Sequence, residues 1–206
     1  MIISTTELLI LKKNIVYSRV TTKMKSQVQL AVSTVLIAQP FWQDERYKRS
    51  VILLIDHGPA GSTGIILNKL SNLCVNEVVS DLKLGLPLYF GGPISMESMS
   101  FIHSFSALPG SAYLGKDLFL NGNFEELLRM VNDKVIRPGK IKFFSGFVTW
   151  SAGELEAEIQ NKQWWTSKIT SHELFSASAD DLWTYELLLN GNIYGLLNEF
   201  PDPGIN

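Results

Sequence analysis

The sequence has one cysteine and three histidines among 206 residues, so it has few of the side chains that build disulfides and metal sites. Cys74 stands alone, which excludes an intramolecular disulfide and fits a reducing environment. In the apolar stretch Leu73-Cys74-Val75 we expect it to be a small buried side chain and not a nucleophile. The scattered histidines lack metal-ligand spacing, and we therefore predict no metal and no cofactor.

Long apolar runs are also missing. No run approaches the roughly 20 residues needed to cross a bilayer. The segment Leu8–Leu11 is too short for a signal-peptide core and is followed by lysines instead of a cleavage site. We therefore expect a cytoplasmic protein without a membrane partner.

The usual catalytic signatures are absent as well. The sequence contains no Gly-x-Ser-x-Gly elbow, no phosphate-binding Gly-x-x-x-x-Gly-Lys-Ser/Thr and no His-Glu-x-x-His. Gly58, Gly61 and Gly64 recur every third residue, a spacing that differs from a dinucleotide fingerprint and favours a flexible hairpin loop over a phosphate cradle. We predict no catalytic residue, and an enzyme for a small anionic or nucleotide substrate is the weakest alternative.

Positive charge is sparse outside the N-terminus. The formal net charge is −2, yet residues 1–23 hold four basic residues against Glu7 alone, which leaves −5 for the remainder. Clustered Lys and Arg supply most non-specific affinity for DNA. With five arginines in the whole chain and an acidic body, we do not expect direct nucleic-acid binding.

The basic N-terminal segment has a simple interpretation. Met24 is followed by Lys25-Ser26-Gln27, a polar sequence typical of a translation start. We interpret residues 1–23 as a non-native or disordered extension and residues 24–206 as a single domain. A chain of this length buries about 70% of its unfolded surface.

Alternating strand and helix signals indicate an α+β protein, a single domain with a mixed, mostly antiparallel sheet flanked by several helices. The apolar run at 50–55 predicts a central strand, paired through a long glycine loop with a strand at 65–67. Further strands are expected at 32–38, 88–90, 99–103 and 141–148, with an edge strand at 164–169, and helices at 75–82, 124–135, 151–160 and 180–189.

Helix-capping patterns occur at three positions in the sequence. Asn123 precedes a helix with acidic residues in its first turn and apolar side chains from Phe124 to Val135 at helical spacing. Ser151 and Thr170 each stand three residues before a glutamate, the spacing of a capping box. Glu154, Glu156 and Glu158 follow Ser151 closely. We interpret them as solvated charges favoured by the helix dipole and not as a general acid.

Three blocks give the chain a resemblance to a known family. They are Asp44-Glu45-Arg46-Tyr47-Lys48-Arg49-Ser50-Val51, running through His57 to Gly64-Ile65-Ile66-Leu67-Asn68; Leu88-Tyr89-Phe90-Gly91-Gly92-Pro93-Ile94, followed by Ile102-His103; and Gly146-Phe147-Val148-Thr149-Trp150-Ser151-Ala152-Gly153-Glu154-Leu155-Glu156-Ala157-Glu158. Their order resembles the YqgE/AlgH family over about residues 32–189. The resemblance implies an α+β fold of an uncharacterised bacterial family and a nominal role in transcriptional regulation.

Two positions depart from the family pattern. The third block has Ser151-Ala152-Gly153-Glu154 where Gly-Pro-Gly-Gln is common, and Lys69-Leu70 stand where Arg-Pro is usual. If an arginine there grips an anion, Lys69 would hold it only as a point charge without the bidentate fork.

Polar residues of these blocks lie at expected strand ends, where binding sites often form. We hypothesise that five of them line one polar groove for a small anionic ligand or a partner peptide: Arg49, His57, Asn68, His103 and Trp150. The alternative is that they hold the fold together, with Trp150 in the core.

A binding or regulatory protein that acts through a protein partner or small ligand fits these features best. Exposed aromatic side chains would serve such a role, and the candidates are Trp42, Trp164 and Trp165. A direct DNA-binding regulator is the alternative that the family resemblance offers.

Overall fold

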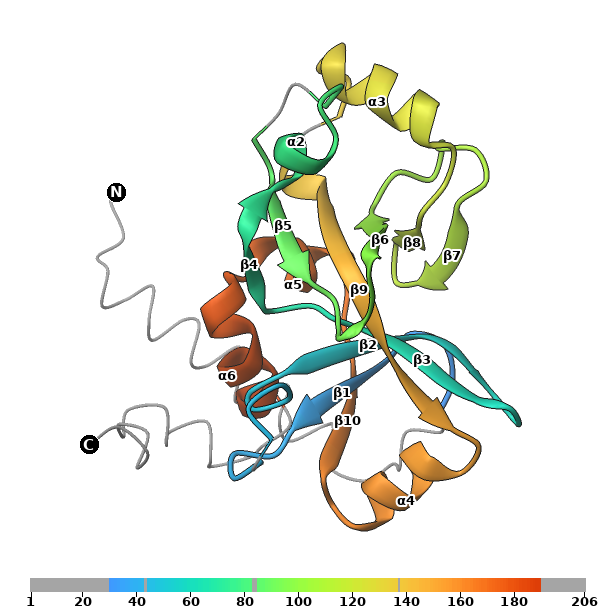
Figure 1. The fold of residues 1–206 in the computed structure, drawn as a ribbon. Helices are drawn as coiled ribbons and strands as arrows, with labels where there is room; N and C mark the ends of the chain where they lie inside the picture. Colours follow the sequence, from blue (N-terminus) through green and yellow to red (C-terminus); the bar gives the residue numbers. More distant parts are fainter. Residues whose placement is uncertain (1–29, 43, 83–84, 137, 190–206) are drawn as a thin grey trace, which may run out of the picture.

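The computed structural model describes residues 30–42, 44–82, 85–136 and 138–189 (Figure 1). The expected extension at 1–23 and Met24 lie outside the described residues. The strands are β1 (Thr34–Ala38), β2 (Val51–Gly58), β3 (Gly61–Ile66), β4 (Leu70–Cys74), β5 (Pro87–Phe90), β6 (Ile94–His103), β7 (Ala112–Gly115), β8 (Leu118–Leu120), β9 (Ile141–Ser151) and β10 (Trp164–Lys168). The helices are α2 (Val75–Val78), α3 (Phe124–Asn132), α4 (Glu154–Gln160), α5 (Ser171–Ser176) and α6 (Ala179–Leu189), with a 3₁₀ turn η1 (Pro138–Lys140).

All the strands form one mixed sheet in the order β10-β1-β2-β3-β9-β6-β8-β7, with β4 and β5 on a branch. Each pair is antiparallel except β5 with β9, which run parallel. The predicted fold class, α+β with a mostly antiparallel sheet and several flanking helices, is confirmed. The expected edge strand is β10, at one end of this order.

Strand β9 joins the two halves of the sheet. Its last residues, from Val148 to Ser151, pair with β3, whereas its first residues pair with β6 on one side and β5 on the other. In Figure 1 this strand runs diagonally between the upper and lower parts of the molecule. The strands that pair with β9 come from the first and second sequence blocks, and β9 itself carries part of the third.

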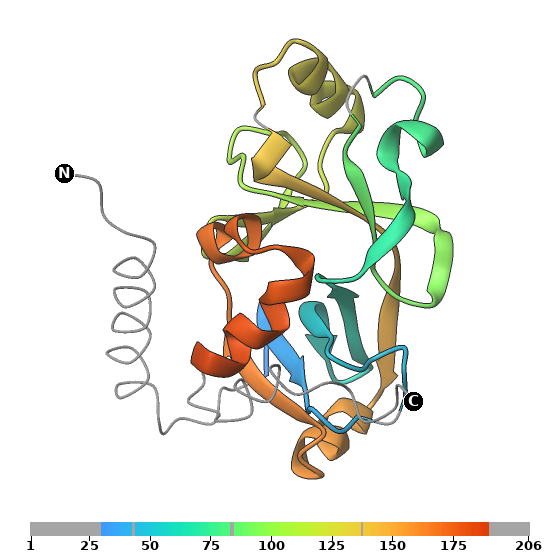
Figure 2. The ribbon, with the colours of Figure 1, turned by 90° about the vertical axis from the view of Figure 1, so that its left-hand side faces the viewer.

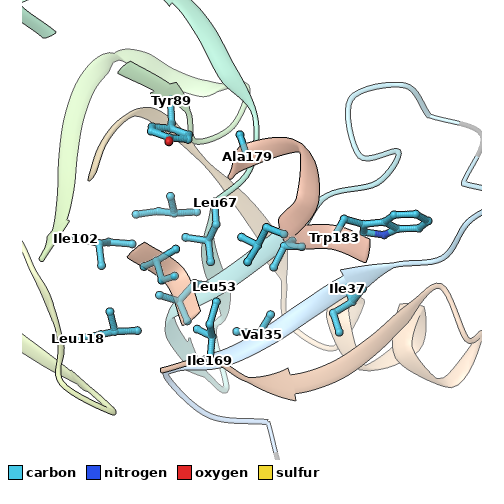
Figure 3. Packing of buried hydrophobic residues seen from close by; sticks show 14 of the residues in the cluster. Val35, Ile37, Leu53, Leu67, Tyr89, Ile102, Leu118, Ile169, Ala179 and Trp183 are labelled. Atoms are coloured by element: carbon cyan, nitrogen blue, oxygen red, sulfur yellow. The ribbon is translucent and has the colours of Figure 1, made fainter. Parts of the chain in front are cut away.

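Alternate side chains of the central strands enter different cores. Val35 and Ile37 of β1 and Leu53 of β2 pack beneath Trp183 of α6 (Figure 3), while Leu36 enters the core on the opposite face, beside α4. Figure 2 shows α6 over β1, with α5 above it. A third core lies beneath α3. Because β1 and β2 are buried on both faces, their sequences are apolar without alternation.

Two glycines are required where the β5–β6 connection crosses β9. Gly146 has φ of 72°, and a Cβ atom there would lie 2.2 Å from the carbonyl oxygen of Gly92. A Cβ on Gly92 would meet the backbone of Phe147 equally closely. The two backbones therefore approach closely enough to exclude any side chain.

The glycine loop predicted between β2 and β3 is wrong. Both strands continue into it, Gly58 pairs with Gly61, and the turn itself is Pro59–Ala60. Gly61 takes part in the sheet because its missing Cβ allows contact with the carbonyl oxygen of Trp150. Gly61 and Gly64 thus serve close strand packing, whereas a side chain at Gly58 would meet no neighbour.

Other departures are local. The helix expected at 75–82 ends at Val78, and strands β4, β7 and β8 were not predicted. Val135 lies beyond α3 and is 64% exposed instead of facing the core. Cys74, expected to be buried, is exposed because it ends the outer strand β4. Among the described residues, no helix has the length and apolar character to cross a membrane.

Candidate functional site

Arg49 and Asn68 lie together at the open end of the β2–β3 hairpin. The Asn68 side chain accepts a hydrogen bond from the Val51 N–H and donates one to the Arg49 carbonyl, each at 2.8 Å. The Arg49 guanidinium lies 5.5 Å from the ring centre of Trp183. Asn68 thus extends the pairing of β2 with β3 through its side chain.

His57 lies at the opposite end of β2. Its Nδ1 is 2.8 Å from the Ser62 hydroxyl, and its Nε2 is 3.9 Å from the Glu156 carboxylate of α4. Ser62 is the sheet partner of both His57 and Trp150, so these three residues share one face of the sheet.

His103 lies in the other half of the sheet and is fully buried. Its Nδ1 accepts the Phe105 N–H at 3.1 Å, which leaves the proton on Nε2 to be donated to the Asn121 carbonyl at 2.8 Å. The ring stacks between Phe105 and Phe119. Burial lowers the pKa of His103, so it is a neutral core residue with both nitrogens engaged.

The five residues of the predicted groove therefore occupy three separate places. Arg49 and Asn68 lie at one end of β2, and His57 and Trp150 share a sheet face at the other end. His103 lies on β6, which pairs with β8 and β9. Lys69, considered above as an anion ligand, donates instead to the carbonyls of Glu45 and Arg46 and holds their loop.

Trp150 leads to a different site. Its indole N–H donates to Oε2 of Glu158 at 2.8 Å, and the indole N–H of Trp164 donates to the same oxygen at 2.7 Å. Both indoles are almost fully buried. Two donors on one oxygen fix the position of the carboxylate.

Glu158 opens onto a pocket of about 510 Å³ between the β1–β2 connection and the turn from α4 to β10. A hydrogen bond from the Gln39 N–H to the Gln163 carbonyl joins these two segments of the lining. The lining side chains are aromatic, amide and charged: Gln39, Phe41, Trp42, Asp44, Tyr47, Glu158, Asn161, Lys162 and Gln163.

Aromatic rings form one wall. The Trp42 ring lies 4.4 Å from that of Trp164 behind it, and Tyr47 packs edge-on against both at 6.2 and 6.3 Å. Phe41, at the rim, is 74% exposed. Of the predicted exposed aromatics, Trp42 is half-buried and lines the pocket, Trp164 is buried behind it, and Trp165 packs against the core beneath α6.

The two carboxylates in the wall differ in their partners. Asp44 is paired with Arg46 at 2.6 Å, and these hydrogen bonds lower the pKa of Asp44 and raise that of Arg46. Oε1 of Glu158 has no hydrogen bond or ion pair within the described parts of the chain. Lys162, on the turn after α4, is exposed and also lines the pocket.

Sequence reasoning missed Glu158, which was interpreted as a solvated helix charge. The signal available was that a glutamate on a short helix lies between two tryptophans, Trp150 and Trp164, whose N–H groups need acceptors when buried. No group of three potential metal ligands comes together in residues 30–189 as described.

A model of the AlgH-like family matches residues 35–194 of this chain. The chain belongs to the AlgH-like family. It is 36% identical over 178 residues to a UPF0301 protein of Parabacteroides distasonis, covering 84% of this chain and 90% of the relative. A UPF0301 protein of Bacteroides thetaiotaomicron is 35% identical over 171 residues, covering 81% and 86%. The resemblance inferred from the three sequence blocks is confirmed.

Solved structures agree with this assignment. The AlgH protein of Pseudomonas aeruginosa, determined in solution, matches with a TM-score of 0.67 and 24% identity, covering 87% of this chain and 98% of that one. A crystal structure from Corynebacterium diphtheriae matches with a TM-score of 0.66 and 22% identity, covering 89% and 94%. At these identities the likeness shows that this AlgH-like chain shares their fold.

Proposed function

We propose that this protein acts by binding, and that the pocket beside Glu158 receives a group from a protein partner or a small ligand. The observation that carries the proposal is the Glu158 carboxylate, which lines a pocket, has one oxygen held by two buried indole N–H groups, and has no partner for the other oxygen among the described residues. A regulatory role for a family member would operate through such an interaction.

Three features support binding at this position. A pocket lined by aromatic rings with a few oriented polar groups is the usual form of a ligand site. The carboxylate is held in place before any ligand arrives, which lowers the entropic cost of binding. The first and third sequence blocks meet here, since Asp44 and Tyr47 come from one and Glu158 from the other.

The test uses the indole N–H signals of Trp42, Trp150 and Trp164 in nitrogen-15 NMR spectra, assigned with single Trp→Phe variants. The protein is titrated with a panel of capped amino acids, nucleotides, sugars and organic acids. We expect at least one class of compound to shift these three signals, with Trp42→Ala abolishing the response. Trp165→Ala, which alters a tryptophan outside the pocket lining, is the control.

Two outcomes would count against the proposal. One is that every compound that binds leaves the three indole signals unchanged. The other is that Trp42→Ala binds the same compounds with unchanged affinity, which would place their site elsewhere on the molecule.

A further inference from the structure

We infer that the group received by the pocket is a guanidinium, supplied by an arginine side chain or by a small guanidinium compound. This inference rests on the proposed function and specifies the chemistry of its ligand. It departs from the anionic ligand hypothesised from the sequence, because Arg49, His57 and His103 do not meet in this pocket.

The protein already shows this recognition once, within the pocket wall. The Arg46 side chain donates to both carboxylate oxygens of Asp44 at 2.6 to 3.1 Å, and its guanidinium lies 5.5 Å from the ring centre of Tyr47. A planar guanidinium is suited to this pairing because it hydrogen-bonds a carboxylate while stacking on an aromatic face.

A second carboxylate and aromatic pair lines the same pocket without such a cation. Oε1 of Glu158 lacks a hydrogen-bonding or ionic partner in the described residues, and the ring of Trp42 lines the same cavity. Amide groups at Gln39, Asn161 and Gln163 offer further acceptors around it. A guanidinium has five N–H donors, more than one carboxylate oxygen can accept, so these amides suit it.

Lys162 is the one feature of the lining that opposes a cation. It stands four residues after Glu158, yet no ion pair joins the two among the described residues. Its ammonium lies on an exposed turn and is screened by solvent. Lys162→Gln should therefore raise affinity for a guanidinium about twofold, whereas a pocket for an anion would lose affinity with the same change.

The experiment compares N-acetyl-arginine-N-methylamide with its citrulline analogue, which has the same shape but no charge. Binding is followed through the indole N–H signals of Trp150 and Trp164, which bond directly to Glu158. We expect the arginine compound to bind at least about tenfold more tightly than the citrulline compound, as hydrogen bonds to charged groups require.

The variant that tests the charge is Glu158→Gln, because the glutamine oxygen can still accept both indole N–H groups. We expect its preference for arginine over citrulline to fall to about one. Glu125→Gln, an exposed charge change on α3, is the matched control and should keep the wild-type preference. Equal binding of both compounds to the wild-type protein would overturn the guanidinium inference.

Failure of this inference can be separated from failure of the proposed function. If citrulline, a sugar or an acid shifts the indole signals as strongly as arginine does, the pocket binds ligands but not by charge. If nothing shifts them, both are wrong. Free arginine and the capped compound distinguish the two sources: tighter binding of the capped form supports a partner side chain, and tighter binding of free arginine supports a small molecule.

Discussion

Strand β9 carries a buried polar side chain near each of its ends, and only one of the two has a hydrogen-bond partner among the described residues. Near its end, the Trp150 N–H meets the carboxylate of Glu158. Near its start, the Lys142 ammonium is buried with no hydrogen-bond partner in the described residues and lies 4.8 Å from the ring centre of Tyr89. Burying a polar group costs free energy unless a hydrogen-bond partner replaces water. Trp150 has such a partner, and Lys142 has only the aromatic ring.

The two ends of β9 also differ in how the fold treats a charged group placed there. Burial lowers the pKa of Lys142 to about 8, which means that the fold disfavours its charge. At the Glu158 end, by contrast, the two indoles fix the position of a carboxylate that lines the pocket. One buried polar group therefore lacks a hydrogen-bond partner among the described residues, while the other holds a carboxylate that lines a pocket.

The largest change in the free energy of unfolding is expected from removing the Glu158 carboxylate, which accepts both indole N–H groups. Glu158→Leu leaves two buried indole N–H groups without a partner and should lower the free energy of unfolding by about 4 kcal/mol. Glu158→Gln keeps an acceptor and should lose less than about 1 kcal/mol. Urea unfolding measures both. Equal stability of the two variants would mean that the indoles do not depend on this acceptor.

The next largest change is an increase in the free energy of unfolding, expected when Lys142 is replaced. Lys142→Met removes the buried ammonium and should stabilise the protein at pH 7 by on the order of 3 kcal/mol, since each pKa unit corresponds to about 1.4 kcal/mol. The folded lysine loses its proton near pH 8, before the unfolded one does near 10.5. Wild-type stability thus rises over this range, and the advantage of the variant shrinks.

Thermal unfolding at pH 7, 9 and 10.5 checks the Lys142 prediction. Lys140→Met, an exposed lysine two residues away, is the control and should change little at any of these pH values. A constant difference between Lys142→Met and wild type from pH 7 to 10.5 would contradict it.

His103, on the neighbouring strand β6 and paired with Ile141, is a buried polar side chain whose hydrogen bonds are satisfied. Because burial lowers its folded pKa below 6.5, its contribution is complete above pH 6.5 and is lost as the unfolded state takes up a proton below it. The loss is at most about 1.4 kcal/mol per pH unit. His103→Phe should flatten the decline of unfolding free energy between pH 6.5 and 5.

The smallest effect on stability is expected from the contact between the Tyr89 ring and the Lys142 ammonium. The Tyr89 ring offers its π face to the ammonium, an interaction worth about 0.5 to 1 kcal/mol. A double-mutant cycle of Tyr89→Leu and Lys142→Met at pH 7 should return a coupling of this size. A coupling near zero would leave Lys142 without any compensation from this ring.

Much of the fold follows from local sequence. The apolar run of β2 gave a buried strand, and the capping residues Asn123 and Thr170 both accept the backbone N–H three residues on, as predicted. Gly61 and Gly64 were misread as loop residues because what requires them, the close approach of Trp150, comes from a strand that is distant in sequence. Short strands such as β8 have too few residues for a detectable alternation.

The candidate site was less accessible from sequence. The side chains of Asn68 and His103 bond mainly to backbone groups, and the Arg49 guanidinium lies near the Trp183 ring. Glu158 differs from its neighbours Glu154 and Glu156 only in what it faces after folding. Periodicity places all three on a short helix, but only the packing of α4 against two tryptophans selects one of them.

The central place of β9 also has a kinetic consequence. Strands β3, β5 and β6 come earlier in the chain, yet each hydrogen-bonds to a strand that ends at Ser151. During synthesis, the edge of each of these strands that pairs with β9 stays unpaired until β9 emerges. Long-range pairing of this kind slows folding and exposes strand edges to aggregation. We therefore expect the nascent chain to be most vulnerable just before residues 141–151 leave the ribosome.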